Sequence, residues 1–122
     1  MKATELMIED WVCLKDDTKC EFPLKVDGVL TDDISLEGEG FLGGVDGLIR
    51  PIPITPEILE KNGWWYYSND MWQHEEVGFY IEKWNGRFQC YDINDIKLDS
   101  VYQLQHTLRL CGLNELADNF KV

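Results

Sequence analysis

The hydrophobic positions of the first fifty residues fall in short runs that are separated by turn-forming residues. Four runs alternate or are wholly apolar: residues 11–15, 20–26, 34–37 and 47–54. Runs of this length, bounded by Asp, Asn and Gly, are typical of β-strands. Asp27-Gly28 predicts a turn that ends the second strand, and Pro23 restricts that strand to a sheet edge or a bulge. We therefore expect a small, bent antiparallel sheet or an SH3-like barrel at the N-terminus.

Residues 55–63 instead carry the start and stop signals of a short helix. Thr55 is a favourable N-cap, Pro56 suits the first helical position, and Asn62-Gly63 is a stop signal, so about two helical turns are predicted. Residues 77–84 then alternate, and residues 87–93 return after Asn85-Gly86, a type I′ turn signal. This part of the chain therefore predicts a short helix followed by an antiparallel β-meander.

A second helix is predicted from residue 101. Ser100 and Gln103 have the spacing of a capping box, and Gly112 can end the helix in the left-handed conformation. Its apolar stripe repeats at helical spacing: Val101, Leu104, Leu108 and Cys111. The whole pattern predicts an α+β fold in a single domain, residues 1–122, with a β-rich subregion at 1–50 and the helix, meander and C-terminal helix at 51–122.

The run Trp64-Trp65-Tyr66-Tyr67 enters a predicted strand directly after the first helix. Strand alternation sends one Trp–Tyr pair to each face of the sheet, so only one pair can pack under the helix. A second layer of this domain, a partner, self-association or solvent would cover the other pair. The candidate binding surface combines aromatic and acidic positions: Trp64, Trp65, Tyr66, Tyr67, Trp72, Trp84, Asp16, Asp17, Asp32 and Asp33.

The net charge of the chain indicates which kinds of molecule it can bind. The chain carries 11 basic and 23 acidic residues, a net charge of −12, and most of the excess lies in the first half. Such a field repels nucleic-acid backbones and anionic membranes, so we expect neither direct nucleic-acid binding nor a membrane partner. It attracts a protein with a basic surface, including a surface that normally holds DNA.

The N-terminal residues contain no apolar signal-peptide core, and no apolar run is long enough to span a membrane, so we expect a cytoplasmic protein. Free thiols suit that compartment, and all four cysteines are expected to be free. Their spacing does not match a zinc site, and Cys90 and Cys111 are expected to be small core residues.

Catalytic and cofactor motifs are weak. Residues 38–43 read G-x-G-x-x-G, but no helix start follows them, so a hairpin loop is predicted and no cofactor is expected. His74 lies beside Glu75 and Glu76 and is expected at a solvated loop edge, and His106 is expected on the exposed side of its helix. We expect no enzyme activity, with a metal-dependent hydrolase around His74 as an alternative.

Three blocks of the sequence carry a resemblance: K-A-T-E-L at residues 2–6, P-I-P-I-T at 51–55 with its Gly63-Trp64 stop, and V-Y-Q-L-Q at 101–105. Together with their flanks they cover about a third of the chain. The chain resembles a family of small proteins encoded by phages and mobile elements of anaerobic gut bacteria, for which no activity is established. Members commonly have glycine where this chain has Glu9. The resemblance implies an accessory protein of such an element and transfers no functional residue.

Three functional hypotheses follow. The first is a non-enzymatic module that binds another protein, for instance a host-defence protein, through its acidic half and exposed aromatic side chains. The second is a nucleotide-binding protein that stacks its ligand on Trp64, Trp65, Trp72 or Trp84, although Arg50, Arg87 and Arg109 are dispersed along the sequence. The third is the hydrolase.

Overall fold

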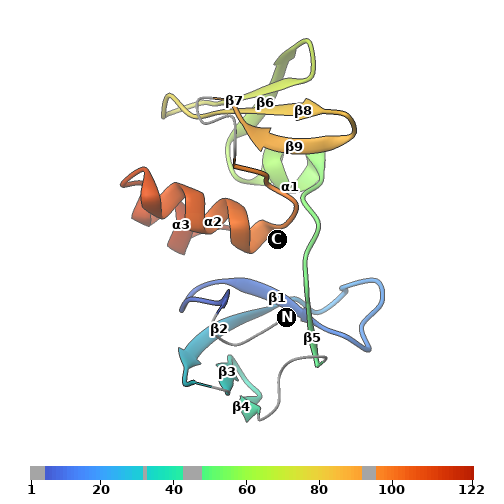
Figure 1. Cartoon of the computed structure of the whole chain (residues 1–122), viewed down its shortest axis with the longest axis vertical. Helices are drawn as coiled ribbons and strands as arrows, with labels where there is room; N and C mark the ends of the chain where they lie inside the picture. The colour runs from blue at the N-terminus through green and yellow to red at the C-terminus, as the bar shows by residue number, and fades with distance from the viewer. Residues whose placement is uncertain (1–4, 32, 43–47, 92–95) are drawn as a thin grey trace.

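The computed structural model describes residues 5–31, 33–42, 48–91 and 96–122. Its fold is α+β, as predicted, with a five-stranded and a four-stranded antiparallel sheet and three short helices among these residues. The two sheets lie at opposite ends of the molecule, and helices α2 and α3 lie between them (Figure 1). None of the described helices has both the length and the apolar character needed to cross a bilayer.

The N-terminal part of the chain forms the five-stranded sheet. Its strands are β1 Trp11–Leu14, β2 Leu24–Val29, β3 Ile34–Leu36, β4 Gly40–Leu42 and β5 Ile49–Pro51. They are ordered β4-β3-β2-β1-β5, so β4 and β5 are the two edges. Because these edges do not pair with each other in the described structure, the sheet does not close into the SH3-like barrel that was one of the two expectations. Residues 38–42 belong to the hairpin of β3 and β4, where a hairpin loop was predicted.

The predicted turn at Asp27-Gly28 is wrong, because β2 continues through both residues to Val29. The pairing register of β2 with β3 shifts between Val26 and Gly28, so this dipeptide forms a bulge. A Cβ at Gly28 would lie 3.3 Å from Ser35 and 3.4 Å from the ring of Phe41, so glycine allows this close packing.

Helix α1, Pro56–Lys61, confirms the capping prediction. The Thr55 hydroxyl accepts a hydrogen bond of 3.2 Å from the Ile58 N–H. Asn62 is the C-cap, and Gly63 follows it with φ +91°. The helix buries Ile58 and Leu59 against the core, which compensates for its short length.

The four-stranded sheet contains the predicted meander as β8 and β9 and the predicted strand at Trp64 as β6, whereas β7 was not predicted. Its strands are β6 Trp64–Ser68, β7 Met71–His74, β8 Tyr80–Trp84 and β9 Arg87–Cys90, and they pair in chain order. Asn85 and Gly86 both have positive φ, 51° and 77°, as a type I′ turn requires.

Helices α2, Val101–Leu110, and α3, Asn114–Asp118, complete the core. The Gln103 amide oxygen accepts from the Ser100 N–H at 3.0 Å, as in a capping box. At the other end, the Leu113 N–H donates to Leu108 O at 2.9 Å and the Gly112 N–H donates to Arg109 O at 3.0 Å, which is a Schellman motif. Cys111 is exposed, contrary to prediction, because it is the C-cap residue and no longer follows the buried stripe.

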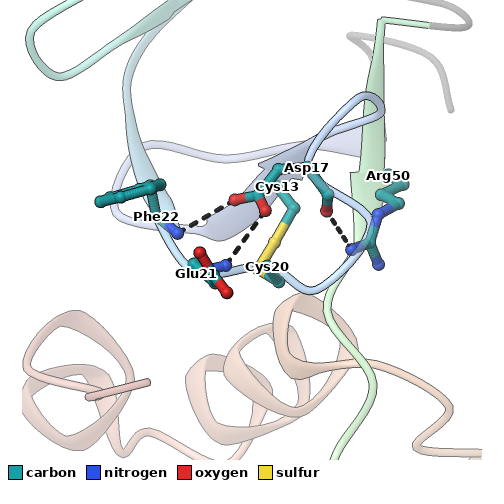
Figure 2. Close-up of a disulfide and its surroundings, with 6 residues drawn as sticks. All are labelled: Cys13, Asp17, Cys20, Glu21, Phe22 and Arg50. Atoms are coloured by element: carbon teal, nitrogen blue, oxygen red, sulfur yellow. Dashed lines mark hydrogen bonds between the residues drawn. A yellow bond between two sulfur atoms is a disulfide. The ribbon is translucent and has the colours of Figure 1, made fainter.

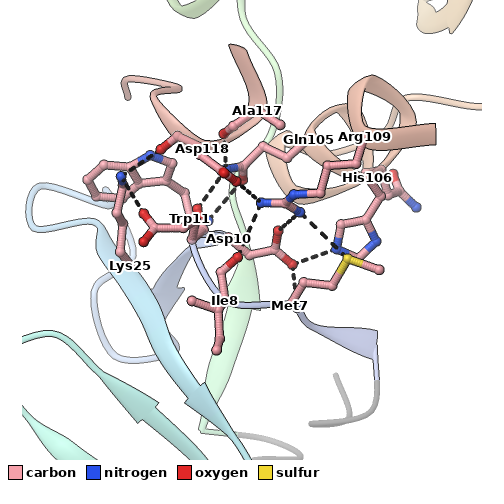
Figure 3. Close-up of polar contacts among 12 residues, drawn as sticks. Met7, Ile8, Asp10, Trp11, Lys25, Gln105, His106, Arg109, Ala117 and Asp118 are labelled. Carbon is pink, nitrogen blue, oxygen red and sulfur yellow. Dashed lines mark hydrogen bonds and ion pairs between the residues drawn. The ribbon is translucent and has the colours of Figure 1, made fainter. Parts of the chain in front are cut away.

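A buried polar network joins the five-stranded sheet to α2 (Figure 3). Asp10, which is fully buried, accepts from Arg109 Nη1 and from the Met7 N–H, both at 2.8 Å. Asp10 also contacts His106 Nε2 at 2.6 Å, so the prediction that His106 is exposed is wrong: its side chain is only 22% exposed.

Gln105 makes the second link of this network and is also fully buried. Its side-chain oxygen accepts from the Trp11 N–H at 3.0 Å, and its amide nitrogen donates to Glu9 O at 2.7 Å and Ala117 O at 3.0 Å. The indole N–H of Trp11 donates to Phe120 O at 2.6 Å. The start of β1 is therefore bound to α2 and to Phe120, which follows α3.

Candidate functional site

His74 is a structural residue in β7 and not a solvated loop residue, so that prediction is wrong. Its Nδ1 accepts from the backbone N–H groups of Glu76 and Val77 at 3.1 and 3.3 Å. This fixes the tautomer, so Nε2 carries the proton and donates to Asn62 O at 2.9 Å. With both ring nitrogens in use, His74 has no lone pair for a metal or a substrate proton.

A shallow, open cavity of about 590 Å³ lies between the β7–β8 loop and the α2–α3 turn. His74, Glu76, Glu115 and Asn119 contribute to its walls. Because the His74 nitrogens are bonded to the backbone, the cavity has no histidine available as a base. Across the described part of the chain, no three His, Cys, Asp or Glu side chains are grouped so that they could hold a metal ion.

The outward face of the four-stranded sheet is rich in aromatic side chains. The strand register places Trp65 opposite Gln73, Gln73 opposite Tyr80, and Met71 opposite Glu82, so these residues share one face. We call this surface the aromatic sheet face; its members are Trp65, Tyr67, Met71, Gln73, Tyr80, Glu82, Trp84, Arg87, Gln89 and Tyr91.

Four large rings of the aromatic sheet face are solvent-exposed: Trp65 at 48%, Tyr67 at 60%, Trp84 at 64% and Tyr91 at 49%. Trp65 contacts Tyr67, with ring centroids 6.3 Å apart, and Tyr80 contacts Tyr91 at 6.2 Å. The helices lie against the opposite face of the sheet (Figure 1). The described part of the chain therefore provides no second layer over these aromatic side chains.

The other predicted aromatic residues lie on the core side. Trp64 and Trp72 are buried, at 1% and 5% exposure, so neither can contact a ligand at the surface. Tyr66 packs edge-on against Trp72 at 5.1 Å but keeps 52% of its surface exposed. Strand alternation thus separates the four-residue run as expected, but burial covers only Trp64.

Sequence reasoning missed Tyr80 and Tyr91 as members of the exposed surface. Tyr80 lies between Phe79 and Ile81, and Tyr91 follows Cys90, so neither stands out from the apolar residues of its predicted strand. The period of two in β8 and the pairing of β8 with β9 could have placed both on the face of Trp84.

The predicted acidic positions do not converge. Asp16 and Asp17 lie before β2 and Asp33 lies after it, so they occupy opposite ends of that strand, and Asp32 lies outside the described residues. At the end of the molecule formed by the five-stranded sheet, the described residues nevertheless include six with exposed carboxylates: Glu5, Asp16, Glu21, Asp27, Glu37 and Glu39. Only Lys15 and Lys19 are exposed cations there.

Nearby carboxylates also affect the phenol group of Tyr102. Burial raises the pKa of Tyr102, and the carboxylates of Glu5, Asp10 and Asp99 raise it further. Beyond the five-stranded sheet, the rest of the described chain also exposes carboxylates, at Glu57, Glu60, Asp70, Glu75, Glu76, Asp99 and Glu115, but more exposed cations accompany them: Lys61, Lys83, Arg87, Lys97 and Lys121.

Asp17 organises a loop that a disulfide closes (Figure 2). Its carboxylate accepts from the N–H groups of Glu21 and Phe22 at 3.1 and 3.0 Å, and its carbonyl accepts from Arg50. The hydrogen bond from Phe22 is the main reason that the pKa of Asp17 lies below its usual value of 3.8. These contacts hold the loop that bears Asp16 and Asp17 against β5.

Cys13 and Cys20 form this disulfide, with Cα atoms 5.7 Å apart, so the expectation of four free thiols is wrong. The two residues are seven positions apart, a spacing that gives no zinc or redox motif, and only the β1–β2 turn brings them together. Cys90 is buried, as predicted.

Reduction of the Cys13–Cys20 disulfide is expected to lower the free energy of unfolding by about 2 kcal/mol, because the closed loop is short. Urea unfolding of the wild type with and without reductant measures the difference. The double variant Cys13→Ser/Cys20→Ser should match the reduced wild type and show no further response to reductant. If reductant does not change the urea midpoint of the wild type, this disulfide does not stabilise the fold.

No protein-family model matches the sequence, and no curated protein or solved structure shows significant similarity to it.

A nucleotide site is poorly supported by the surroundings of the exposed tryptophans. The nearest cations on β8 and β9 are Lys83, which lies 5.6 Å from the Phe88 ring centroid on the core side, and Arg87. Arg87 forms a bidentate pair with Asp99, with N–O distances of 3.1 and 2.8 Å. The guanidinium that the strand register places opposite Trp84 is therefore already paired with a carboxylate.

Proposed function

We propose that this protein is a non-enzymatic accessory protein of a phage or mobile element that binds another protein on its aromatic sheet face. The observation that carries the proposal is the exposure of Trp65, Tyr67, Trp84 and Tyr91 on one uncovered sheet face. Exposed aromatic residues supply most of the binding energy in protein interfaces, because each buries a large area with few rotatable bonds.

The net charge of the chain favours a partner protein with a basic surface. The net charge of −12 raises the association rate with a basic protein and disfavours acidic partners. The partner that fits is therefore a protein with apolar pockets for the aromatic rings and a basic surface around them.

A local observation supports the context of a mobile element. Glu9 has φ +77°, a conformation that glycine adopts without strain, and glycine is common at this position in the family that the chain resembles. In this chain the Glu9 carboxylate forms a salt bridge with Lys25, with an N–O distance of 2.9 Å.

The test begins with recovery of the tagged protein from a bacterial host and identification of its partner by native mass spectrometry. The purified partner is then titrated with the wild type, with Trp84→Ala and with Leu110→Ala. Leu110 is the matched control, because it is a large exposed apolar residue on α2, away from the aromatic sheet face.

We expect Trp84→Ala to raise the dissociation constant at least about tenfold and Leu110→Ala to leave it unchanged. The affinity should also fall with added salt if the partner is basic. A partner that binds Trp84→Ala and the wild type equally well would contradict the proposed surface, and a bound nucleotide in the mass spectrum would favour the second hypothesis.

A further inference from the structure

Among the described residues, strand β6 is a free edge of the four-stranded sheet, since it is the terminal strand and pairs only with β7. The Glu75 N–H donates to Gly63 O at 2.8 Å, which identifies Gly63–Glu75 as a hydrogen-bonded pair. Because such pairs alternate along an antiparallel ladder, Trp65 directs its N–H and C=O toward β7. Tyr66 therefore directs its N–H and C=O outward, to the side where β6 has no neighbouring strand.

This edge lacks the charged and proline residues that usually prevent pairing with another chain. Sheet edges are commonly protected by lysine, proline or charged side chains that point inward. The strand Trp64–Ser68 contains no lysine, proline or charged residue, and residues 65–68 are all exposed. Its one irregularity is the register shift against β7 between Tyr66 and Ser68, which leaves the pairing of Trp65 and Tyr66 with β7 regular. The opposite edge strand, β9, differs, because Gln89 is bridged to Lys97.

We propose that β6 pairs antiparallel with β6 of a second copy of this chain, with the two-fold axis at Tyr66. The outward N–H and C=O of Tyr66 would then bond to the C=O and N–H of the partner's Tyr66. Two four-stranded sheets would become one eight-stranded sheet. An isologous pairing of this kind closes on itself and does not propagate into a fibre.

The side chains of the strand are self-complementary in this register. Trp65 lies directly opposite the partner's Tyr67, and the symmetry repeats the contact, which gives two aromatic cross-strand pairs on the outward face. These are non-hydrogen-bonded positions, where side chains approach most closely, and aromatic pairs there are favourable. No charged residue lies between Asn62 and Asn69, so no like charges oppose each other.

The charge distribution favours a second copy at this end of the molecule. Residues 1–51, which contain the five-stranded sheet, carry 5 basic and 12 acidic side chains, a net charge of −7, whereas residues 52–122 carry 6 and 11, a net charge of −5. The five-stranded sheet, which bears most of the acidic excess, lies at the far end from β6 (Figure 1). Pairing through β6 keeps the two acidic ends apart, and it joins both aromatic sheet faces into one surface.

The experiment compares the wild type with Tyr66→Pro and Tyr66→Ala by sedimentation equilibrium. Proline at position 66 removes only the outward N–H, and proline is tolerated at such an edge position. Alanine keeps this N–H and serves as the matched control for loss of the ring. Trp84→Ala controls for the aromatic sheet face, because it lies on β8 and away from the edge.

We expect the wild type and Trp84→Ala to form dimers, and Tyr66→Pro to raise the dimer dissociation constant at least about tenfold more than Tyr66→Ala does. The wild type should also protect the Tyr66 amide from hydrogen exchange at high protein concentration and lose this protection on dilution. This second measurement decides the question if Tyr66→Pro does not fold.

A wild type that stays monomeric at several hundred micromolar, with a fast-exchanging Tyr66 amide, would overturn the proposal. Protection of that amide only on addition of a different protein would also overturn it, because the edge would then accept a strand from a partner. Both results leave the proposed function open to its own test, since Trp84→Ala probes the sheet face and not the edge.

Discussion

Gly63→Ala is expected to lower the free energy of unfolding by about 3 kcal/mol. A Cβ at this position would lie 2.8 Å from His74 Nε2 and 3.2 Å from its Cε1, and φ is +91°. The His74 ring cannot move aside, because its two nitrogens are bonded to Asn62 and to the Glu76 and Val77 backbone. Urea denaturation followed by tryptophan fluorescence measures the change.

Gly86→Ala separates conformational strain from crowding. Gly86 also has positive φ, +77°, but a Cβ there would meet no atom within 4 Å. Its substitution should cost only about 1 kcal/mol, the strain of a left-handed residue. Equal losses for the two variants would show that the close approach of His74 to Gly63 contributes nothing to stability.

Asp10→Ala is expected to cost about 3–5 kcal/mol, since it leaves partners of a buried ion pair uncompensated. Asp10 is fully buried between Arg109 Nη1 at 2.8 Å and His106 Nε2 at 2.6 Å. The five-stranded sheet should therefore loosen from α2. Chemical denaturation gives the loss, and hydrogen exchange at Trp11 should increase, because the N–H of this residue is bonded to Gln105.

Glu9→Gln is the control for this prediction. Glu9 pairs with Lys25 at 2.9 Å, but its carboxylate is 40% exposed, and exposed pairs contribute at most about 1 kcal/mol. If Asp10→Ala costs no more than Glu9→Gln, the network around Asp10 does not hold the two parts of the molecule together.

The elements that sequence reasoning predicted correctly are those with local signals. The start of α1 at Thr55, the turn at Asn85-Gly86 and the end of α2 at Gly112 depend on a few neighbouring residues whose backbone preferences are strong. The aromatic run was correctly assigned to a strand for the same reason, because alternation needs no knowledge of the rest of the chain.

The features that sequence reasoning missed depend on residues far apart in the chain. His106 was expected to be exposed because its helix face is polar, but Asp10, 96 positions earlier, covers it. Trp72 gave no sign of whether it lies on the core side, since this depends on the β6–β7 register and on the bulge between Tyr66 and Ser68. Asp27-Gly28 was predicted to be a turn but forms a bulge within β2, because bulges and turns favour the same residue types.

The network between β1 and the C-terminal helices has a consequence for synthesis of the chain. The groups that hold β1 come from positions 105–120, so the sheet residues at 11–51 leave the ribosome well before their docking partners exist. Contacts of such large sequence separation form late and slow the overall folding rate. Until α2 and α3 are made, the indole of Trp11 and the carboxylate of Asp10 remain in water, and the nascent sheet depends on its own small apolar cluster.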